Sequence, residues 1–158
     1  MNDMGTDNIA VVRRLVEEVW NKGNFAVLGE LVSDKYIGTH PIIGTVRGLE
    51  GFKQQVQTFR APFPDLRLDI DDIGMAGDRV FNRWTARGTQ RGAFMGVQPS
   101  NNNGQVQGIA LDRFAEGKIV EHHESFDTLS LFQIMGAVPP LDRIVKGGQQ
   151  AQQQMPRA

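Results

Sequence analysis

Two adjacent histidines and three carboxylates lie within seven residues, in the segment EHHESFD that runs from Glu121 to Asp127. Side chains of these types can bind a metal ion, transfer a proton, or simply face solvent on a polar strand. Neighbouring residues of a strand point to opposite faces, so the segment would present two different surfaces. One face would carry Glu121, His123, Ser125 and Asp127. The other face would carry His122, Glu124 and Phe126.

This alternation argues against a metal site. The two neighbouring histidines cannot both bind one metal ion from the same strand, and the chain has only three histidines and no cysteine. A zinc site would therefore need His123 together with His40 and further ligands from distant segments. We expect neither a metal nor another cofactor.

Asp127 has two interpretations. If its face of the strand lines a cavity under helices, desolvation raises the pKa of the carboxyl group, which can then take and return a proton near neutral pH. Alternatively, Asp127 caps the helix predicted to follow it, because Asp directly before Thr-Leu-Ser-Leu is a good N-cap. The spacing alone favours the cap. His122, on the opposite face, is expected to face solvent or a second subunit. Glu121 is expected to lie on the surface or to pair with Arg113 across the hairpin.

The elements that would position these residues follow from hydrophobic periodicity. Apolar residues recur at helical spacing in three N-terminal segments, at about 9–20, 25–32 and 49–60. Farther along the chain they alternate with polar residues, which predicts strands at about 66–70, 80–89, 105–115 and 118–127. A loop or a short strand is expected from Tyr36 to Gly48, and a loop from Gly92 to Gly104. Because no helix separates the long strands, we expect an α+β fold with helices on one face of a curved antiparallel sheet.

Length and charge limit the classes of function. A chain of 158 residues suggests one domain, for which we expect the range 1–145, followed by a Gln-rich, disordered tail at 146–158. Seventeen basic and 18 acidic residues argue against nucleic acid or acidic lipid as a partner. No signal peptide is recognisable and no apolar run approaches the roughly 20 residues of a membrane span, so we expect a cytoplasmic protein.

Several segments resemble the SnoaL-like polyketide cyclases, a family of the nuclear transport factor 2-like superfamily. The longest is GKIVEHHESFDTLSLFQIMGAVP, from Gly117 to Pro139. VRRLVEEVWNKGN resembles the first helix of the family, LRLDIDDIGMAGDRVFNRWTARGT its first long hairpin, and APFPD and GAFMGVQPS its loops. The resemblance implies a cone-shaped fold, with a curved antiparallel or mixed sheet wrapped around the N-terminal helices.

The resemblance also implies a chemistry. Family cyclases close a polyketide ring by an intramolecular aldol reaction without a cofactor, and an aspartate at the position of Asp127 serves as general acid and base. His40 matches a pocket histidine of the family, although a loop histidine bonded to the backbone is an equal alternative. Arg83 matches a family arginine that binds a substrate oxygen or, in our preferred interpretation, pairs with an interior acid such as Asp112. Cavity-lining or plain core roles are expected for Phe59, Phe63, Trp84, Phe94 and Met95.

Two departures from the family pattern leave the function open. Gln90 replaces a histidine and cannot supply a proton, while His123 replaces a tryptophan and is a candidate to take over part of that catalytic role. The chain is therefore expected to be a cofactor-free cyclase acting on a polyketide-like carbonyl compound. The alternatives are a non-catalytic module that binds a small apolar molecule, and an epoxide hydrolase or isomerase on the same scaffold. A sheet with apolar residues on both faces further predicts a homodimer through the outer face.

Overall fold

The computed structural model describes residues 4–153. Helix α1 (Met4–Arg14) continues as a π-helical segment (Leu15–Asn21), and a short 3-10 turn (Phe25–Val27) leads into α2 (Leu28–Leu31). Helix α3 spans Gly48–Arg60, α4 spans Thr128–Ile134 and α5 spans Leu141–Gln153. The predicted helices at about 9–20, 25–32 and 49–60 are thus confirmed, with the second one broken into two short pieces.

Six strands form one mixed sheet in the order β2-β1-β6-β5-β4-β3. The strands β1 (Val32–His40) and β2 (Gly44–Arg47) occupy most of the stretch from Tyr36 to Gly48, for which a loop or a short strand was expected. The strands β3 (Arg67–Ala76), β4 (Arg79–Thr89), β5 (Asn103–Ala115) and β6 (Lys118–Phe126) form the predicted meander. Only β1 and β6 pair in parallel, and the other neighbours are antiparallel. The sheet is therefore mixed, and β1 brings His40 beside the histidine-rich strand β6.

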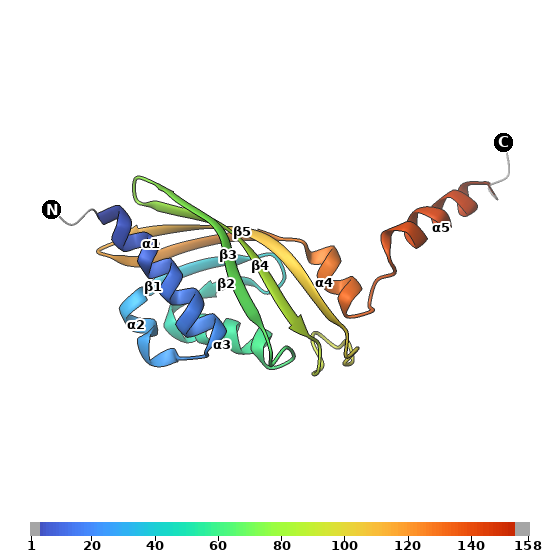
Figure 1. Cartoon of the computed structure of the whole chain (residues 1–158), viewed down its shortest axis with the longest axis horizontal. Helices are drawn as coiled ribbons and strands as arrows, with labels where there is room; N and C mark the ends of the chain where they lie inside the picture. The colour runs from blue at the N-terminus through green and yellow to red at the C-terminus, as the bar shows by residue number, and fades with distance from the viewer. Residues whose placement is uncertain (1–3, 154–158) are drawn as a thin grey trace.

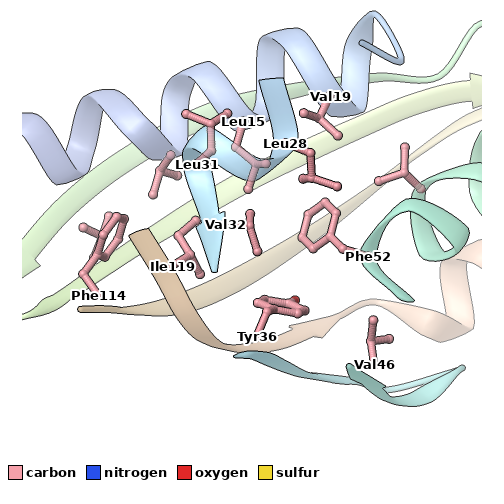
Figure 2. Packing of buried hydrophobic residues seen from close by; sticks show 13 residues of the cluster. Leu15, Val19, Leu28, Leu31, Val32, Tyr36, Val46, Phe52, Phe114 and Ile119 are labelled. Carbon is pink, nitrogen blue, oxygen red and sulfur yellow. The ribbon is translucent and has the colours of Figure 1, made fainter. Parts of the chain in front are cut away.

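The sheet curls around the N-terminal helices without closing (Figure 1). One core lies where α1, α2 and α3 meet the sheet, and Figure 2 shows Leu15 and Val19 pointing from the first helix toward Leu28 and Leu31. Aromatic rings close its lower side, where Tyr36 and Phe52 meet edge to face with centroids 5.3 Å apart. Burying these side chains supplies most of the driving force for folding.

A second group of buried residues continues the interior toward α4. It includes Phe63, Phe94, Leu131 and Met135. Between the two groups, Trp84 lies flat against β5, where a Cβ atom at Gly108 would collide with the indole ring. The glycine is thus required for Trp84 to enter the interior of the curled sheet.

Helix α5 projects away from the body of the molecule (Figure 1). The segment from residue 146, expected to be disordered, is helical up to Gln153, and residues 154–158 lie outside the described part of the chain. Leu141, Ile144 and Val145 are exposed on this helix. Within the described residues, none of the helices combines the length and the apolar character that crossing a membrane requires.

Candidate functional site

A cavity of about 110 Å³ lies between the N-terminal helices and the concave face of the sheet. Most of its wall is apolar, and the large aromatic residues of the wall are Trp20, Phe52, Phe59, Phe63, Trp84 and Phe126. Six buried or largely buried polar side chains interrupt this surface: His40, Gln55, Asn82, Asp112, His122 and Glu124. An apolar pocket with a few convergent polar groups is the usual form of a small-molecule site.

The centre of the polar group is His122. Strands β5 and β6 place Asp112 directly opposite His122, and His122 Nδ1 lies 2.7 Å from Asp112 Oδ1. The other ring nitrogen, Nε2, lies 3.3 Å from Glu124 Oε2, two residues along the same face of β6. Burial lowers the pKa of His122, but the charge and hydrogen bond of Asp112 and the contact with Glu124 outweigh it and raise the pKa to about 10. His122 is therefore an imidazolium that bridges two carboxylates at neutral pH.

His40 extends the network from β1. Its Nε2 lies 2.9 Å from Glu124 Oε1, and its Nδ1 accepts hydrogen bonds from the backbone N–H groups of Ile42 and Ile43. A nitrogen that accepts cannot carry a proton, so the ring is the neutral tautomer with its proton on Nε2. His40 consequently donates to Glu124 and holds that carboxylate in place. His40 thus lines the cavity and also binds the backbone of the turn, and its catalytic role stays a prediction.

Glu124 is the acceptor of both histidines. Burial raises the pKa of its carboxyl group, but the hydrogen bonds from His122 and His40 outweigh it and lower the pKa to about 2. The site thus contains two carboxylates, one imidazolium and one neutral imidazole, in a largely apolar cavity. Such a chain of groups can exchange protons with a ligand and can stabilise negative charge that develops on a ligand oxygen.

Asp127 lies outside this arrangement. It is exposed at the end of β6, where Oδ1 accepts from the backbone N–H of Ser130 at 2.9 Å and Oδ2 accepts from the Ser130 hydroxyl at 2.5 Å. These hydrogen bonds lower the pKa of Asp127 rather than raising it, and the carboxylate caps α4. The capping interpretation is confirmed. The acid–base role of Asp127 stays a prediction, and its exposed position weighs against it.

The two faces of β6 are reversed relative to our expectation. His122, expected to face solvent or a second subunit, points into the cavity with 15% of its side chain exposed. His123 points outward with 51% of its side chain exposed and binds Glu121 at 2.8 Å. Glu121 also pairs with Arg113 as predicted, with 2.7 Å between Oε2 and Nε. His123 therefore does not share the cavity with His40.

Arg83 also lies on the outer face. Asp112, the partner expected from the sequence, is on the opposite side of the sheet. The guanidinium group of Arg83 binds Asp71 and Asp72 of β3 instead. The prediction of a pairing with Asp112 was wrong because residue 83 alternates with Trp84, which points inward. Arg83 does not line the cavity in this structure.

The remaining predicted site residues divide between wall and support. Phe59, Phe63 and Trp84 line the cavity, as expected. Phe94 is buried against Phe59 and Phe63 behind the wall, whereas Met95 is exposed on the loop after β4.

Gln90 has a structural role in the loop between β4 and β5. Its buried amide donates to the backbone of Gly92, Val97 and Gln98 and accepts from the N–H of Ser100. It holds the loop between β4 and β5 together and does not line the cavity.

Glu124, His122 and Asp112 were not predicted from the sequence as site residues. A signal was present, because Phe126 shares a face of β6 with the first two, and an apolar residue on a strand face indicates the buried side. Gln55 and Asn82 gave no comparable signal, since single amides in apolar patterns occur on many elements.

Comparisons with known proteins agree with this fold. The family model of the SnoaL-like polyketide cyclases matches residues 10–134. A structure provisionally named a SnoaL-like polyketide cyclase, from Jannaschia sp. CCS1, is 25% identical with a TM-score of 0.80 and covers 89% of this chain and 98% of its own. No curated protein matches the chain.

Two structures from Streptomyces are similar as well. IdmH from Streptomyces antibioticus, provisionally named a polyketide cyclase, is 29% identical with a TM-score of 0.71, covering 82% of this chain and 98% of its own. AclR from Streptomyces galilaeus, provisionally named a hydroxylase, is 26% identical with a TM-score of 0.74, covering 85% of this chain and 98% of its own. With the family model matching most of its length and the fold shared with these neighbours, the chain belongs to the SnoaL-like polyketide cyclase family.

Proposed function

We propose that the protein is a cofactor-free acid–base enzyme that closes a ring in a neutral, polyketide-like carbonyl compound by an intramolecular aldol reaction. Membership of the family supports the reaction class. The single observation that supports the residues is the hydrogen-bonded chain Asp112–His122–Glu124–His40 in the wall of an apolar cavity. In this proposal Glu124, rather than the expected Asp127, transfers the proton.

The reaction begins with a change of partner at His122. Its contact with Glu124 is longer than that with Asp112, 3.3 Å against 2.7 Å, so Nε2–H is the proton more easily given to a substrate carbonyl oxygen. When the Nε2–H group of His122 turns to the substrate, Glu124 loses a hydrogen-bond donor. The pKa of Glu124 then rises toward that of a usable base. Glu124 then removes a proton from the carbon next to the carbonyl group, and the His122 cation stabilises the enolate oxygen.

The second half returns the proton. The enolate carbon attacks a second carbonyl carbon of the same molecule, which forms the ring bond and an alkoxide. Glu124 protonates the alkoxide, so the carboxylate is regenerated and no other reactant is consumed. The apolar wall orients the two carbonyl groups and excludes water that would compete for the proton.

The test compares two carboxylates in one assay. 1-Tetralone, a neutral aromatic ketone, is incubated with protein in deuterium oxide, and loss of its α-proton signal is followed by NMR. We expect wild-type exchange to fall at least about 100-fold in Glu124→Gln and to stay within about twofold in Asp127→Asn. The opposite result, with exchange lost only in Asp127→Asn, would transfer the base role to Asp127 and refute the proposal.

A non-catalytic binding module is the second candidate. The observation in its favour is that the pKa of His122, about 10, and that of Glu124, about 2, both lie far from neutrality in the empty cavity. Under this alternative, 1-tetralone binds to the wild-type protein without any exchange of its α-protons above the buffer rate. Binding is read independently from tryptophan fluorescence, because both tryptophans of the chain, Trp20 and Trp84, line the cavity.

We further propose that the protein forms a homodimer through the outer face of the sheet. Phe81 and Ile109 are 50% and 60% exposed there, in a shallow groove on β3, β4, β5 and β6. Polar pairs border this apolar centre, among them Arg83 with Asp72 on one side and His123 with Glu121 on the other. An apolar centre with a polar rim is the usual anatomy of a protein interface.

A further inference from the structure

One buried polar atom in the cavity wall has no partner. Gln55 on α3 is 3% exposed and lines the cavity, yet its Oε1 accepts no hydrogen bond from any residue that the structure describes. Buried amide oxygens are almost always hydrogen-bonded, because leaving one unpaired destabilises the fold. The unpaired Oε1 of Gln55 therefore lowers the stability of the empty protein, and we expect its hydrogen-bond partner to come from outside the chain.

A polar side chain is unusual at the position of Gln55. It lies three residues after Phe52 and four before Phe59 on the face of α3 that meets the cavity, where a helix of this kind normally carries an apolar residue. A Leu or Met at this position would continue the stripe without leaving an acceptor unpaired. Packing alone thus does not explain the amide.

The charges of the site restrict what the partner is. Asp112 and Glu124 carry two negative charges and His122 one positive charge, while His40 is neutral by its hydrogen bonds. These four side chains are therefore negative overall, and Arg87, the cation that also lines the cavity, is paired with Asp69, so the site disfavours an anionic ligand such as a carboxylate. A neutral ligand that reaches Gln55 Oε1 must donate a hydrogen bond, as a hydroxyl group does.

We infer that Gln55 is a specificity-determining residue, whose Oε1 accepts a hydrogen bond from a hydroxyl group of a neutral, aromatic ligand. This inference rests on the proposed use of the cavity as the ligand site, but it does not depend on the base chemistry of Glu124. Gln55 selects ligands that carry a hydroxyl group at the polar end of the cavity. The aromatic wall, which includes Trp20, Phe59 and Trp84, receives the rest of the ligand.

Phenol and toluene provide a matched pair of probes, since they differ by a hydroxyl and a methyl group of similar size and both are neutral at pH 7. Their dissociation constants are measured by tryptophan fluorescence in the full-length protein. We expect Gln55→Met to shift the ratio of the phenol and toluene constants about tenfold against phenol, the effect of one lost hydrogen bond. The melting temperature should rise in the same variant, because the unpaired acceptor is gone.

Two further variants separate this role from a structural one. Gln57→Met changes the same residue type on the exposed side of α3 and should leave the ratio unchanged. Gln55→Glu keeps an oxygen acceptor and should retain the preference for phenol. The inference is overturned if Gln55→Met leaves the ratio at the wild-type value, or if the wild-type protein binds neither probe. Loss of deuterium exchange in Glu124→Gln with an unchanged ratio in Gln55→Met would refute the inference and leave the proposed function intact.

Discussion

His122 and Asp112 are direct partners in the pairing of β6 with β5, and 2.7 Å separates Nδ1 of the imidazole from Oδ1 of the carboxylate. The contact is formed by the backbone register itself, because opposite residues of an antiparallel pair place their side chains next to each other on one face. Asp112 is thereby the residue that fixes the orientation of the His122 ring. Nε2 of His122 is left to point along the strand, toward Glu124 and the cavity.

This arrangement predicts a stability that falls in alkaline solution. The pKa of His122 is raised from 6.5 to about 10, so the charged ring stabilises the fold fully below pH 6.5 and loses that contribution as the pH rises toward 10. The pKa of Glu124 is lowered from 4.5 to about 2, so its contribution is present above pH 4.5 and is lost as the pH falls toward 2. Together, the two effects predict that the free energy of unfolding is largest between pH 4.5 and 6.5.

Urea titrations at pH 6 and pH 9.5 measure the alkaline effect. The free energy of unfolding should fall between these pH values by an amount on the order of 3 kcal/mol. His122→Gln, which has no titrating ring, should be less stable at pH 6 and show a smaller fall. A direct check is the ¹⁵N NMR signal of the His122 ring, which should remain that of an imidazolium at pH 8. A neutral ring at pH 8 would contradict the assignment.

The cap of α4 gives a second prediction. Asp127 accepts two hydrogen bonds from Ser130, so Asp127→Ala should lower the free energy of unfolding by about 1 kcal/mol. Asp127→Asn, which retains a capping oxygen, should cost only a few tenths of that amount. Thermal unfolding followed by circular dichroism distinguishes the two variants. Equal stability of Asp127→Ala and the wild-type protein would show that the capping hydrogen bonds contribute nothing.

Asp127 also illustrates how far the sequence predicts this site. Alternation along EHHESFD shows which residues share a face, but both faces carry carboxylates and histidines, so Phe126 alone indicates which face is buried. The parallel pairing of β6 with β1 decides this, and half of β1 lies in a segment whose Gly, Pro and Thr residues indicate a loop or a short strand and no partner for it. The local cap of Asp127 was predictable because it depends only on the next three residues.

The helices and the long strands were predictable for a related reason. Their periodicity reflects burial on one side, as in the stripe Leu49, Phe52, Val56 and Phe59 of α3. Asp112 and Gln55 break such patterns, and their place in the cavity depends on contacts between elements far apart in the sequence. Site residues of this kind violate local rules, which is why sequence patterns alone do not reveal them.

His40 predicts a separation of stability from catalysis. Its Nδ1 binds the turn after β1 and its Nε2 binds Glu124. The oxygen of Asn superposes on the position of Nδ1, so His40→Asn should keep the turn and lose the contact with Glu124. The longer His40→Gln should reach Glu124 but lose the turn. We expect His40→Asn to lower the deuterium-exchange rate about tenfold with little change in melting temperature. We expect His40→Gln to lower the melting temperature with little change in the exchange rate. Parallel loss of both properties in both variants would show that the two contacts are not separable.

Gln90 predicts a loss of loop order. Four hydrogen bonds join its buried amide to the loop between β4 and β5, and Gln90→Ala removes all of them and leaves a cavity. The free energy of unfolding should fall by about 3 kcal/mol. Limited proteolysis should cleave the variant between residues 92 and 102 faster than the wild-type protein. The matched control is Gln98→Ala, which changes an exposed residue of the same type and should have neither effect. A proteolysis rate equal to wild type in Gln90→Ala would contradict the role of the amide.

The proposed dimer predicts that one charge on the outer face of the sheet separates the subunits. Ile109 is 60% exposed at the centre of the groove, and Ile109→Glu would bury a carboxylate against the apolar surface of the second copy. Light scattering should therefore give the mass of a dimer for the wild-type protein and that of a monomer for this variant. Ile144→Glu is the matched control, because Ile144 is also exposed but lies on the projecting helix α5. A monomeric wild-type protein would refute the dimer, and dissociation by Ile144→Glu alone would move the interface from the sheet to α5.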